Sequence, residues 1–251
     1  MTDKFFWYEL MTNDPAAARK FYGDVVGWEV QDAMDGYELF TTQGRGVAGL
    51  MALPEQAREM GVGPCWTGYI AVEDVDDAAE EIEEEGGEVH REPFEVPDTI
   101  RLAVVADPQG AVFIVGKGLM ENPPPELPAG TPGTVGWHEL YAEDAEEAFE
   151  FYQSQFGWTK TDVMDMGPNG NYYLFAMGGP AIGGMMDKPE QMPKPAWLYY
   201  FNVPALDAAI ERLNAGGGRV IVGPIEVPGG QWIVQGIDPQ GAHFALVAPK
   251  R

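Results

Sequence analysis

The chain has a single cysteine, Cys65, among its 251 residues. It therefore cannot form an intrachain disulfide or a zinc site built from several cysteines. Basic residues are also scarce: 15 lysines and arginines stand against 40 aspartates and glutamates, which gives a formal net charge of −25. A surface this acidic repels the phosphate backbone of nucleic acids, so we expect no nucleic-acid partner.

Long hydrophobic runs are absent as well. No apolar stretch approaches the about 20 residues of a membrane-spanning helix, and residues 1–5 lack the basic and then apolar pattern of a signal peptide. These absences predict a cytoplasmic protein with no membrane partner. The acidic runs at 80–81 and 83–85 predict a solvated helix face that favours solubility. Recruitment of a basic partner is the alternative.

The sequence does contain a long internal repeat. Residues 7–10 (WYEL) return 130 residues later as 137–140 (WHEL). Three further segments return in the same order: Phe21-Tyr22 as Phe151-Tyr152, 47–51 (VAGLM) as 182–186 (IGGMM), and 107–110 (DPQG) as 238–241. Such a period indicates a duplicated domain rather than a solenoid, whose repeats span about 20–50 residues. We predict domain 1 at residues 1–120 and domain 2 at 134–251, joined by a proline-rich linker at 121–133.

Each predicted domain divides into two βαβββ units. In the first unit, an apolar-alternating strand at 6–11 leads to Asp14-Pro15, an N-cap followed by proline at the first helical position. The remaining expected elements of domain 1 are strands at 28–30, 37–42, 47–51, 67–72, around 89, 100–105 and 112–115, and a second helix at 76–85. Domain 2 repeats the order, with helices ending at Phe156 and spanning 207–215. The pattern predicts an α+β fold of antiparallel sheets covered by helices on one side.

This order of units resembles the vicinal oxygen chelate (VOC) superfamily, which includes glyoxalase I, extradiol dioxygenases and bleomycin- or fosfomycin-resistance proteins. The resemblance rests on the Trp-x-Glu-Leu first strand, the Asp-Pro-x-Gly turn before the last strand and the Gly-Gly pair after the second helix. It covers nearly the whole chain outside the linker and implies two tandem glyoxalase-like domains, each curled around a cavity. The reaction does not follow, because the superfamily spans lyases, dioxygenases, transferases and binding proteins.

Metal-dependent members of the superfamily hold a divalent ion with inward-facing His, Glu or Gln side chains. The resemblance places those ligand positions at Trp7, Gly49, Thr67 and Ile114 in domain 1, and at Trp137, Gly184, Leu198 and Ala245 in domain 2. No register supplies three ligands in either domain. We therefore predict no cofactor, with a divalent metal at a displaced site as the alternative.

Two glutamates are the candidates for chemistry in the cavities. Residues two apart on a strand share a face. The predicted cavity faces therefore carry Trp7, Glu9 and Met11 in domain 1, and Trp137, Glu139 and Tyr141 in domain 2. A carboxylate beside tryptophan inside a curled sheet is a candidate proton acceptor or polar anchor, so Glu9 and Glu139 are the candidate catalytic residues. Alternatively, each glutamate has a structural role and hydrogen-bonds backbone groups.

Four further residues are candidate ligand contacts: Trp66, Tyr200, Trp232 and His243. The three aromatic residues lie on strands expected to curl around the cavities, and His243 shares the face of Ala245. Together with Glu139 and Tyr141, His243 makes domain 2 the better-equipped half. Core packing of the aromatic residues and a lining role for the histidine are the alternatives.

These observations favour a protein that binds a small, partly aromatic or apolar molecule in a cavity without the usual metal ligands. One alternative is an enzyme: a glyoxalase-like lyase or isomerase, either metal-dependent with a displaced site or using Glu139 as a base, or a dioxygenase-like enzyme. A further alternative is a stress-related interaction protein. We expect a monomer or a homodimer.

Overall fold

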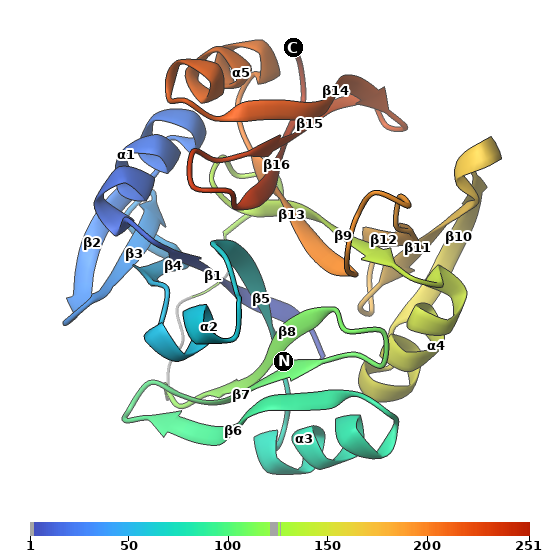
Figure 1. Cartoon of the computed structure of the whole chain (residues 1–251). Coiled ribbons are helices and arrows are strands. Elements are labelled where there is room, and N and C mark those ends of the chain that lie inside the picture. The colour runs from blue at the N-terminus through green and yellow to red at the C-terminus, as the bar shows by residue number, and fades with distance from the viewer. Residues whose placement is uncertain (1–2, 121–124, 126) are drawn as a thin grey trace. The chain divides into compact units, whose positions relative to one another are not determined.

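The computed structural model describes residues 3–120, 125 and 127–251. Within these residues the chain forms four modules, each a strand, a helix and three further strands (Figure 1). The first repeat comprises β1 (Phe5–Thr12), α1 (Pro15–Val26), β2 (Glu29–Met34), β3 (Tyr37–Thr42), β4 (Arg45–Ala52), α2 (Glu55–Glu59), β5 (Cys65–Ala71), α3 (Val75–Glu84), β6 (Glu88–Val96), β7 (Ile100–Ala106) and β8 (Val112–Gly118).

The second repeat has the same order of strands and long helices, with the 3-10 helix η1 added and no counterpart of α2 among its described residues. It comprises β9 (Val135–Ala142), α4 (Ala145–Phe156), β10 (Thr159–Asp165), the 3-10 helix η1 (Gly167–Asn169), β11 (Asn171–Ala176), β12 (Ala181–Asp187), β13 (Ala196–Asn202), α5 (Leu206–Ala215), β14 (Arg219–Val227), β15 (Gln231–Ile237) and β16 (His243–Ala248). None of the helices in the described part of the chain has the length and apolar character that a membrane crossing requires.

Each repeat forms one eight-stranded sheet. The strand orders are β2-β3-β4-β1-β5-β8-β7-β6 and β10-β11-β12-β9-β13-β16-β15-β14. The predicted α+β architecture of four βαβββ modules is confirmed, but the sheets are mixed rather than antiparallel. In every module the first strand pairs in parallel with the last. The helix returns the chain to the end of the sheet where the first strand began, so the second strand is parallel to the first. Two antiparallel hairpins then follow, and they make the last strand parallel to the first as well.

The sequence underestimated both edge strands of the first sheet and missed one helix. β2 extends to Met34 where a strand was expected only at 28–30. β6 runs over nine residues where a strand was expected only around Val89, and its register with β7 shifts twice. Pro93 lies in this strand, and proline is accommodated at a sheet edge because its missing N–H leaves no ladder bond broken. The short α2 follows Pro54 and buries none of its residues, so it gave no apolar periodicity to detect.

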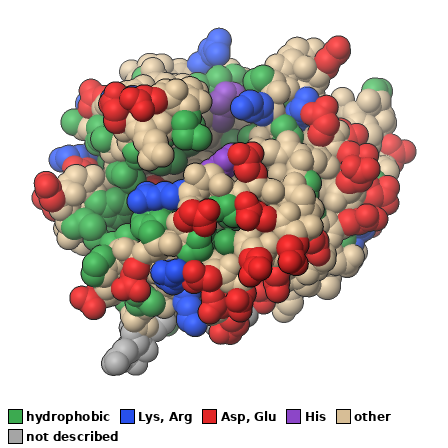
Figure 2. Space-filling view, turned by 60° about the horizontal axis from the view of Figure 1, so that its bottom comes forward, with side chains coloured by type: hydrophobic (Ala, Val, Ile, Leu, Met, Phe, Trp, Pro, Cys, Tyr) green, Lys and Arg blue, Asp and Glu red, His purple; other side chains and the backbone are tan. Residues whose placement is uncertain are grey.

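Acidic side chains cover the outer face of α3. Glu80, Glu81 and residues 83–85 are exposed, whereas Val75, Ala79 and Ile82 are buried. Figure 2 shows Asp and Glu side chains spread over much of the face drawn, with fewer Lys and Arg among them. The acidic run of α3 is therefore a solvated helix face, as the sequence predicted.

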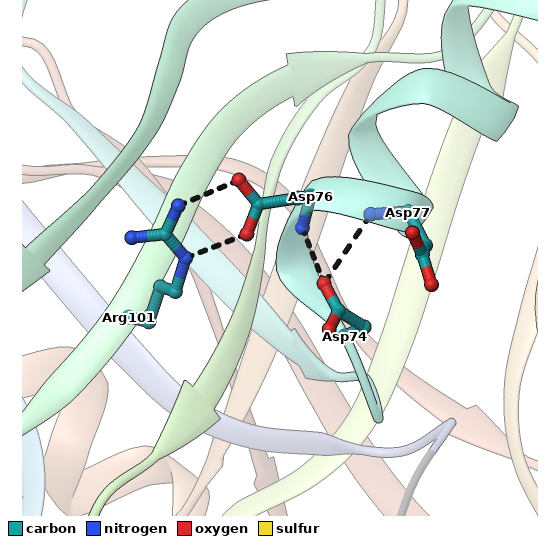
Figure 3. A network of polar contacts seen from close by, with 4 residues as sticks. All are labelled: Asp74, Asp76, Asp77 and Arg101. Carbon is teal, nitrogen blue, oxygen red and sulfur yellow. Dashed lines mark hydrogen bonds and ion pairs between the residues drawn. The ribbon is translucent and has the colours of Figure 1, made fainter.

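The start of α1 follows the capping residue identified in the sequence, and two further helices also start after an aspartate. Asp14 and Asp144 cap α1 and α4, which end at Gly27 and Gly157 in the left-handed conformation. Asp74 caps α3 by accepting hydrogen bonds from the backbone N–H groups of the second and third residues after it (Figure 3). Arg101 on β7 donates both to Asp76 Oδ2 and to Asp76 Oδ1, at 2.7 and 2.6 Å, and so joins the start of α3 to the sheet.

The described contacts group the chain into two compact units. Of the described residues, unit 1 contains 3–6, 67–120, 125 and 138–197, and unit 2 contains 7–66, 127–137 and 198–251. Each unit thus combines most of one module from each repeat. In unit 2 helices α1 and α5 pack against each other, and in unit 1 α3 contacts α4. The predicted linker at 121–133 lies partly outside the described residues, and the domain boundaries 1–120 and 134–251 stay a prediction.

A buried chain of hydrogen bonds holds each unit together. In unit 2 Trp66 Nε1 donates to the Tyr22 hydroxyl at 2.9 Å, and that hydroxyl donates to Asp238 Oδ2 at 3.1 Å. In unit 1 Trp197, Tyr152 and Asp107 make the same two bonds at 2.9 and 3.1 Å. The aspartate of each DPQG turn is therefore bound to a helix from the other repeat, which gives this repeated motif a structural role.

Candidate functional site

Three predicted cavity residues of the first repeat, Trp7, Glu9 and Met11, lie on one face of β1. The parallel register sets Glu9 opposite Gly49 and Met11 opposite Met51 on β4. Tyr37 on β3 pairs with Met51, so its side chain joins the same face. Glu9 is 6% exposed, while Trp7 and Met11 are half-buried.

Tyr37 joins the tryptophan and the glutamate. Trp7 Nε1 donates to the Tyr37 hydroxyl oxygen at 3.1 Å, and the hydroxyl hydrogen-bonds the Glu9 carboxylate. Burial raises the pKa of Tyr37, and the negative charge of Glu9 raises it further. The hydroxyl therefore stays protonated at physiological pH and acts as a fixed donor to Glu9.

Gly49 makes room for this tyrosine. A Cβ atom at Gly49 would lie 2.0 Å from the Tyr37 hydroxyl oxygen and 2.6 Å from the ring carbon that carries it. The tyrosine thus occupies the space into which any side chain at this position would project. Gly49 is also one of the positions that the family resemblance assigned to a metal ligand.

The second repeat carries the same arrangement. The Tyr172 hydroxyl donates to Glu139 Oε1 at 2.9 Å, and a Cβ atom at Gly184 would lie 2.2 Å from the Tyr172 ring. Glu139 is 7% exposed and lies opposite Gly184, and Tyr141, opposite Met186, is half-buried on the same face. Each repeat therefore contains a Glu–Tyr pair lying against a glycine.

Sequence reasoning missed both tyrosines. The signal was present, because Tyr37 and Tyr172 begin matching segments, YELF and YYLF, and each precedes a matched glycine by 12 residues. Nothing in the linear order, however, indicated that these tyrosines reach Glu9 and Glu139 across the one strand between them, β4 or β12.

A separate polar cluster lies on the last module, in unit 2. Gln235 Nε2 donates to the Tyr200 hydroxyl at 2.7 Å, and both residues lie opposite Ala245. His243 shares the face of Ala245, as predicted, but it is exposed at the start of β16. Partial burial and the charge of Arg219 lower the pKa of His243, while Asp238 opposes that shift. Gln235 is buried and was not predicted.

Two predicted lining residues belong to the core behind the sheets instead. Trp66 is buried against α1, where it contacts the rings of Tyr22 and Phe40 and donates to the tyrosine hydroxyl. Tyr69, three residues on, lies opposite Ile114, as Tyr200 does opposite Ala245. Trp66 is three residues from Tyr69 and so lies on the other face of β5, against α1, and its role as a ligand contact stays a prediction.

Trp232 also lies on the helix side of its sheet. Trp232 is three residues from Gln235 and therefore lies on the opposite face of β15, together with Gly236. A Cβ atom at Gly236 would lie 3.0 Å from a side-chain carbon of Leu213 on α5. The Arg251 guanidinium lies 5.2 Å from the Trp232 ring centroid and pairs with Asp207 of the same helix. Trp232 thus lies on the face of β15 away from Gln235, whereas the half-buried Trp137 lies two residues before Glu139, and the roles of both as ligand contacts stay predictions.

The residues at the assigned ligand positions do not fit the metal site of the superfamily that the sequence resembles. Among the described residues, no group of three or more His, Cys, Asp or Glu is placed to hold an ion. At Gly49 and Gly184 the position assigned to a ligand is covered by a tyrosine ring. His138, next to the position of Trp137, is buried with its Nδ1 bonded to the Ile182 carbonyl at 2.9 Å and its ring stacked on Phe5.

Comparisons with known proteins identify relatives over nearly the whole chain. The family model described as Glyoxalase/Bleomycin resistance protein/Dioxygenase superfamily matches residues 4–115 and 134–246. A Mycobacterium bovis protein named "Putative glyoxylase CFP32" is 33% identical over 249 residues, which cover 97% of this chain and 94% of the relative. "Anthracycline biosynthesis protein DauV" from Streptomyces sp. strain C5 is 32% identical over 256 residues, covering 96% and 91%.

A solved structure shares the fold at lower identity. The Mn(II)-bound glyoxalase from Novosphingobium aromaticivorans superposes with a TM-score of 0.70 at 16% identity, covering 99% of this chain and 82% of that protein. The tandem arrangement predicted from the repeat is confirmed by the two matched segments.

Proposed function

This chain belongs to the glyoxalase/bleomycin resistance protein/dioxygenase superfamily, and on that premise we propose that it binds a small, flat, partly aromatic molecule without a metal ion. The observation that carries this proposal is the Glu–Tyr pair against glycine in both repeats. In each copy a tyrosine ring covers one of the positions that the family resemblance assigns to a metal ligand. The pair offers one hydrogen-bonded carboxylate beside aromatic rings.

The side chains around the pairs support an aromatic ligand. Trp7 and Met11 in one repeat, and Trp137 and Tyr141 in the other, are half-buried and lie on the same strand faces as the glutamates. Binding sites for small molecules are mostly apolar with a few polar anchors, and flat rings stack well on indole and phenol faces. The relative named for anthracycline biosynthesis points to the same ligand class, because anthracyclines are planar polycyclic molecules.

An enzyme is the second candidate. The relative named a glyoxylase and the near-complete burial of Glu139 favour a lyase or isomerase in which this carboxylate accepts a proton. The Tyr172 hydroxyl would then fix the carboxylate oxygen that does not take the proton. In that case Glu139→Gln abolishes turnover while the folded state survives, and unchanged turnover rules out the base.

Elemental analysis tests the absence of a metal. We expect protein purified from medium containing Mn, Fe, Ni and Zn to carry far less than one ion per chain. One tightly bound ion in each repeat would overturn the proposal.

A thermal-shift screen of polycyclic aromatics, anthracyclines included, tests binding. A ligand present at about 100 times its Kd stabilises the folded state by about 2.7 kcal/mol. Paired Trp7→Ala and Trp137→Ala substitutions should abolish that shift. If no compound shifts the melting temperature and a basic protein is captured instead, the interaction protein is the better assignment.

A further inference from the structure

One row of side chains crosses three adjacent strands of the last module, within unit 2 (Figure 1). Arg219 on β14 lies opposite Ile237 on β15, and Ile237 lies opposite His243 on β16. Residues that lie opposite each other in a β-ladder project from the same face of the sheet. Arg219 and His243 therefore flank Ile237 on one face, and the positive charge of Arg219 helps to lower the pKa of the His243 ring.

Neither of these two polar side chains is paired within the protein. All eight arginines lie in the described part of the chain, and seven of them contact a carboxylate, a carbonyl oxygen, an aromatic ring or another group. Arg219 is the exception: like His243, it makes no hydrogen bond or ion pair with any residue that the structure describes. Both are exposed. In a chain with 40 acidic and 15 basic residues, Arg219 is thus a cation available to a ligand.

Apolar side chains continue this face beside the charged row. Val222 lies opposite Gln235, and Ile225 lies opposite Ile233, whose side chain is on the face of Ile237. Val222 and Ile225 are 38% and 45% exposed, because β14 is the edge strand of the sheet. The surface, which we call the β14–β16 face, thus offers apolar contacts and a cation together. It consists of Arg219, Val222, Ile225, Ile233, Ile237 and His243.

The second module shows that the fold does not require the two polar residues. Its corresponding row is Glu88, Ala106 and Val112, joined in the same register. A carboxylate therefore occupies the position of Arg219, and an apolar side chain occupies that of His243. The cation and the imidazole distinguish the last module from its duplicate, which favours a binding role over a structural one.

The charge of the face restricts the ligand to a single negative charge. The guanidinium of Arg219 can bind a carboxylate through two parallel N–H···O bonds. The lowered pKa of His243 leaves its ring neutral at pH 7, with one N–H to donate. Asp238, the other charge that acts on this ring, is buried and already accepts from the Tyr22 hydroxyl and two backbone N–H groups. A second negative charge on the ligand would meet only the repulsion of an acidic protein.

We propose that the β14–β16 face binds a small molecule that carries one carboxylate on an apolar body. Arg219 binds the carboxylate, His243 donates a hydrogen bond to it, and Val222 and Ile225 contact the body. This inference goes beyond the proposed function, because it depends on unit 2 alone and uses neither Glu–Tyr pair.

Three naphthalene probes test the inference by NMR titration of the ¹⁵N-labelled protein at about pH 7.5. They are 1-naphthoate, which is a monoanion, 1-naphthamide, which is neutral and nearly the same shape, and 1-naphthyl phosphate, which is mostly a dianion. We expect the naphthoate to bind about five- to tenfold more tightly than the amide, and the phosphate to bind no more tightly than the naphthoate. The Arg219 Nε–H signal and the amide signals of β14 and β16 should shift on binding.

Two variants of equal charge separate the site from the rest of the surface. Arg219→Glu with His243→Val introduces the residues that the second module carries, and it should lower the naphthoate affinity to that of the amide or below. The amide affinity should not change. Lys20→Glu is the matched control: Lys20 is exposed in the same unit, α4 has Glu150 at the equivalent position, and the formal charge changes equally. This variant should keep the preference for naphthoate.

The outcomes are separate from those of the proposed function. Equal binding of naphthoate and amide, an equal loss of preference in the Lys20 variant, tighter binding of the phosphate or no binding of naphthoate each overturns the carboxylate site. None of these results bears on the metal analysis or the screen of neutral polycyclic compounds. If that screen fails while naphthoate binds through Arg219, the proposed function falls and the carboxylate site stands.

Discussion

At the residue scale, the side chain that shapes each candidate site lies on a different strand from the glutamate it binds. Tyr37 and Tyr172 hold Glu9 and Glu139, and each crosses a glycine that leaves space for the ring. The glycine is required by close approach, since neither Gly49 nor Gly184 adopts a left-handed backbone. We therefore expect the stability of the protein to be sensitive to a methyl group added at these glycines.

Gly49→Ala should lower the free energy of unfolding by about 2 kcal/mol, because the new methyl group displaces Tyr37 from Trp7 and Glu9. Gly46→Ala on the same strand is the matched control. Its Cβ would meet the Trp7 ring at 3.4 Å, an ordinary contact, so we expect a change within about 0.5 kcal/mol. Urea denaturation measures both, and similar losses in the two variants would contradict this account.

His138 predicts a dependence of stability on pH. Burial lowers its pKa to about 4, against 6.5 in an unfolded chain. The folded state therefore binds fewer protons than the unfolded state between these values, and the free energy of unfolding falls as pH drops from about 6.5 to about 4. The loss attributable to this residue reaches about 3 kcal/mol.

Denaturation at a series of pH values, with His138→Gln beside the unsubstituted protein, isolates this contribution. Carboxylates titrate in both proteins, so the test compares the slopes of the free energy of unfolding against pH. We expect a shallower slope in the variant, and parallel curves would exclude His138 as the cause.

At the scale of elements, the repeated DPQG turn acts as a clamp on a helix start. The Gln109 side chain accepts from the backbone N–H groups of Glu143 and Asp144 and donates to the Asp144 carbonyl, all at the start of α4. Gln240 binds the backbone N–H and carbonyl of Asp14 before α1 in the same way. The turn thus satisfies backbone N–H groups that the helix itself leaves unpaired, and it adds a second donor to the carbonyl of the capping aspartate, which also accepts from the helix.

Removing this clamp should destabilise unit 1 locally. We expect Gln109→Ala to lower the free energy of unfolding by about 1–2 kcal/mol and to accelerate hydrogen exchange in the first turn of α4. Gln153→Ala, on the exposed face of the same helix, should change neither by a measurable amount. Unaltered exchange at the start of α4 in the Gln109 variant would refute the clamp.

At the scale of the whole molecule, charge is the dominant property. A net charge of −25 destabilises the folded state, because folding brings like charges closer together. Salt weakens this repulsion, with a screening length of about 10 Å at 0.1 M ionic strength. The melting temperature should therefore rise by several degrees between about 20 mM and about 500 mM sodium chloride. Potassium chloride at equal ionic strength should give the same rise if screening is the cause, and a flat response would show that repulsion contributes little.

The sequence by itself determined the order of the four modules, but not the parallel pairing inside them. The repeat and the helix caps gave the four modules, and strand alternation correctly put Glu9 and Met11 on the face of Trp7. These features are local, because a cap or an alternating strand depends on residues a few positions apart. Alternation does not say which face of a strand meets a helix, so it could not show that Trp66 packs against α1 or that Trp232 lies on the α5 side of its sheet.

Tertiary structure decided which partners the local pieces acquired. Tyr37 lies 28 residues after Glu9, and only the order β3-β4-β1 in the sheet brings the two side chains together. The DPQG aspartates similarly found tyrosines on helices of the other repeat. Such pairings depend on strand order and packing across long separations, and no local preference in the chain specifies them.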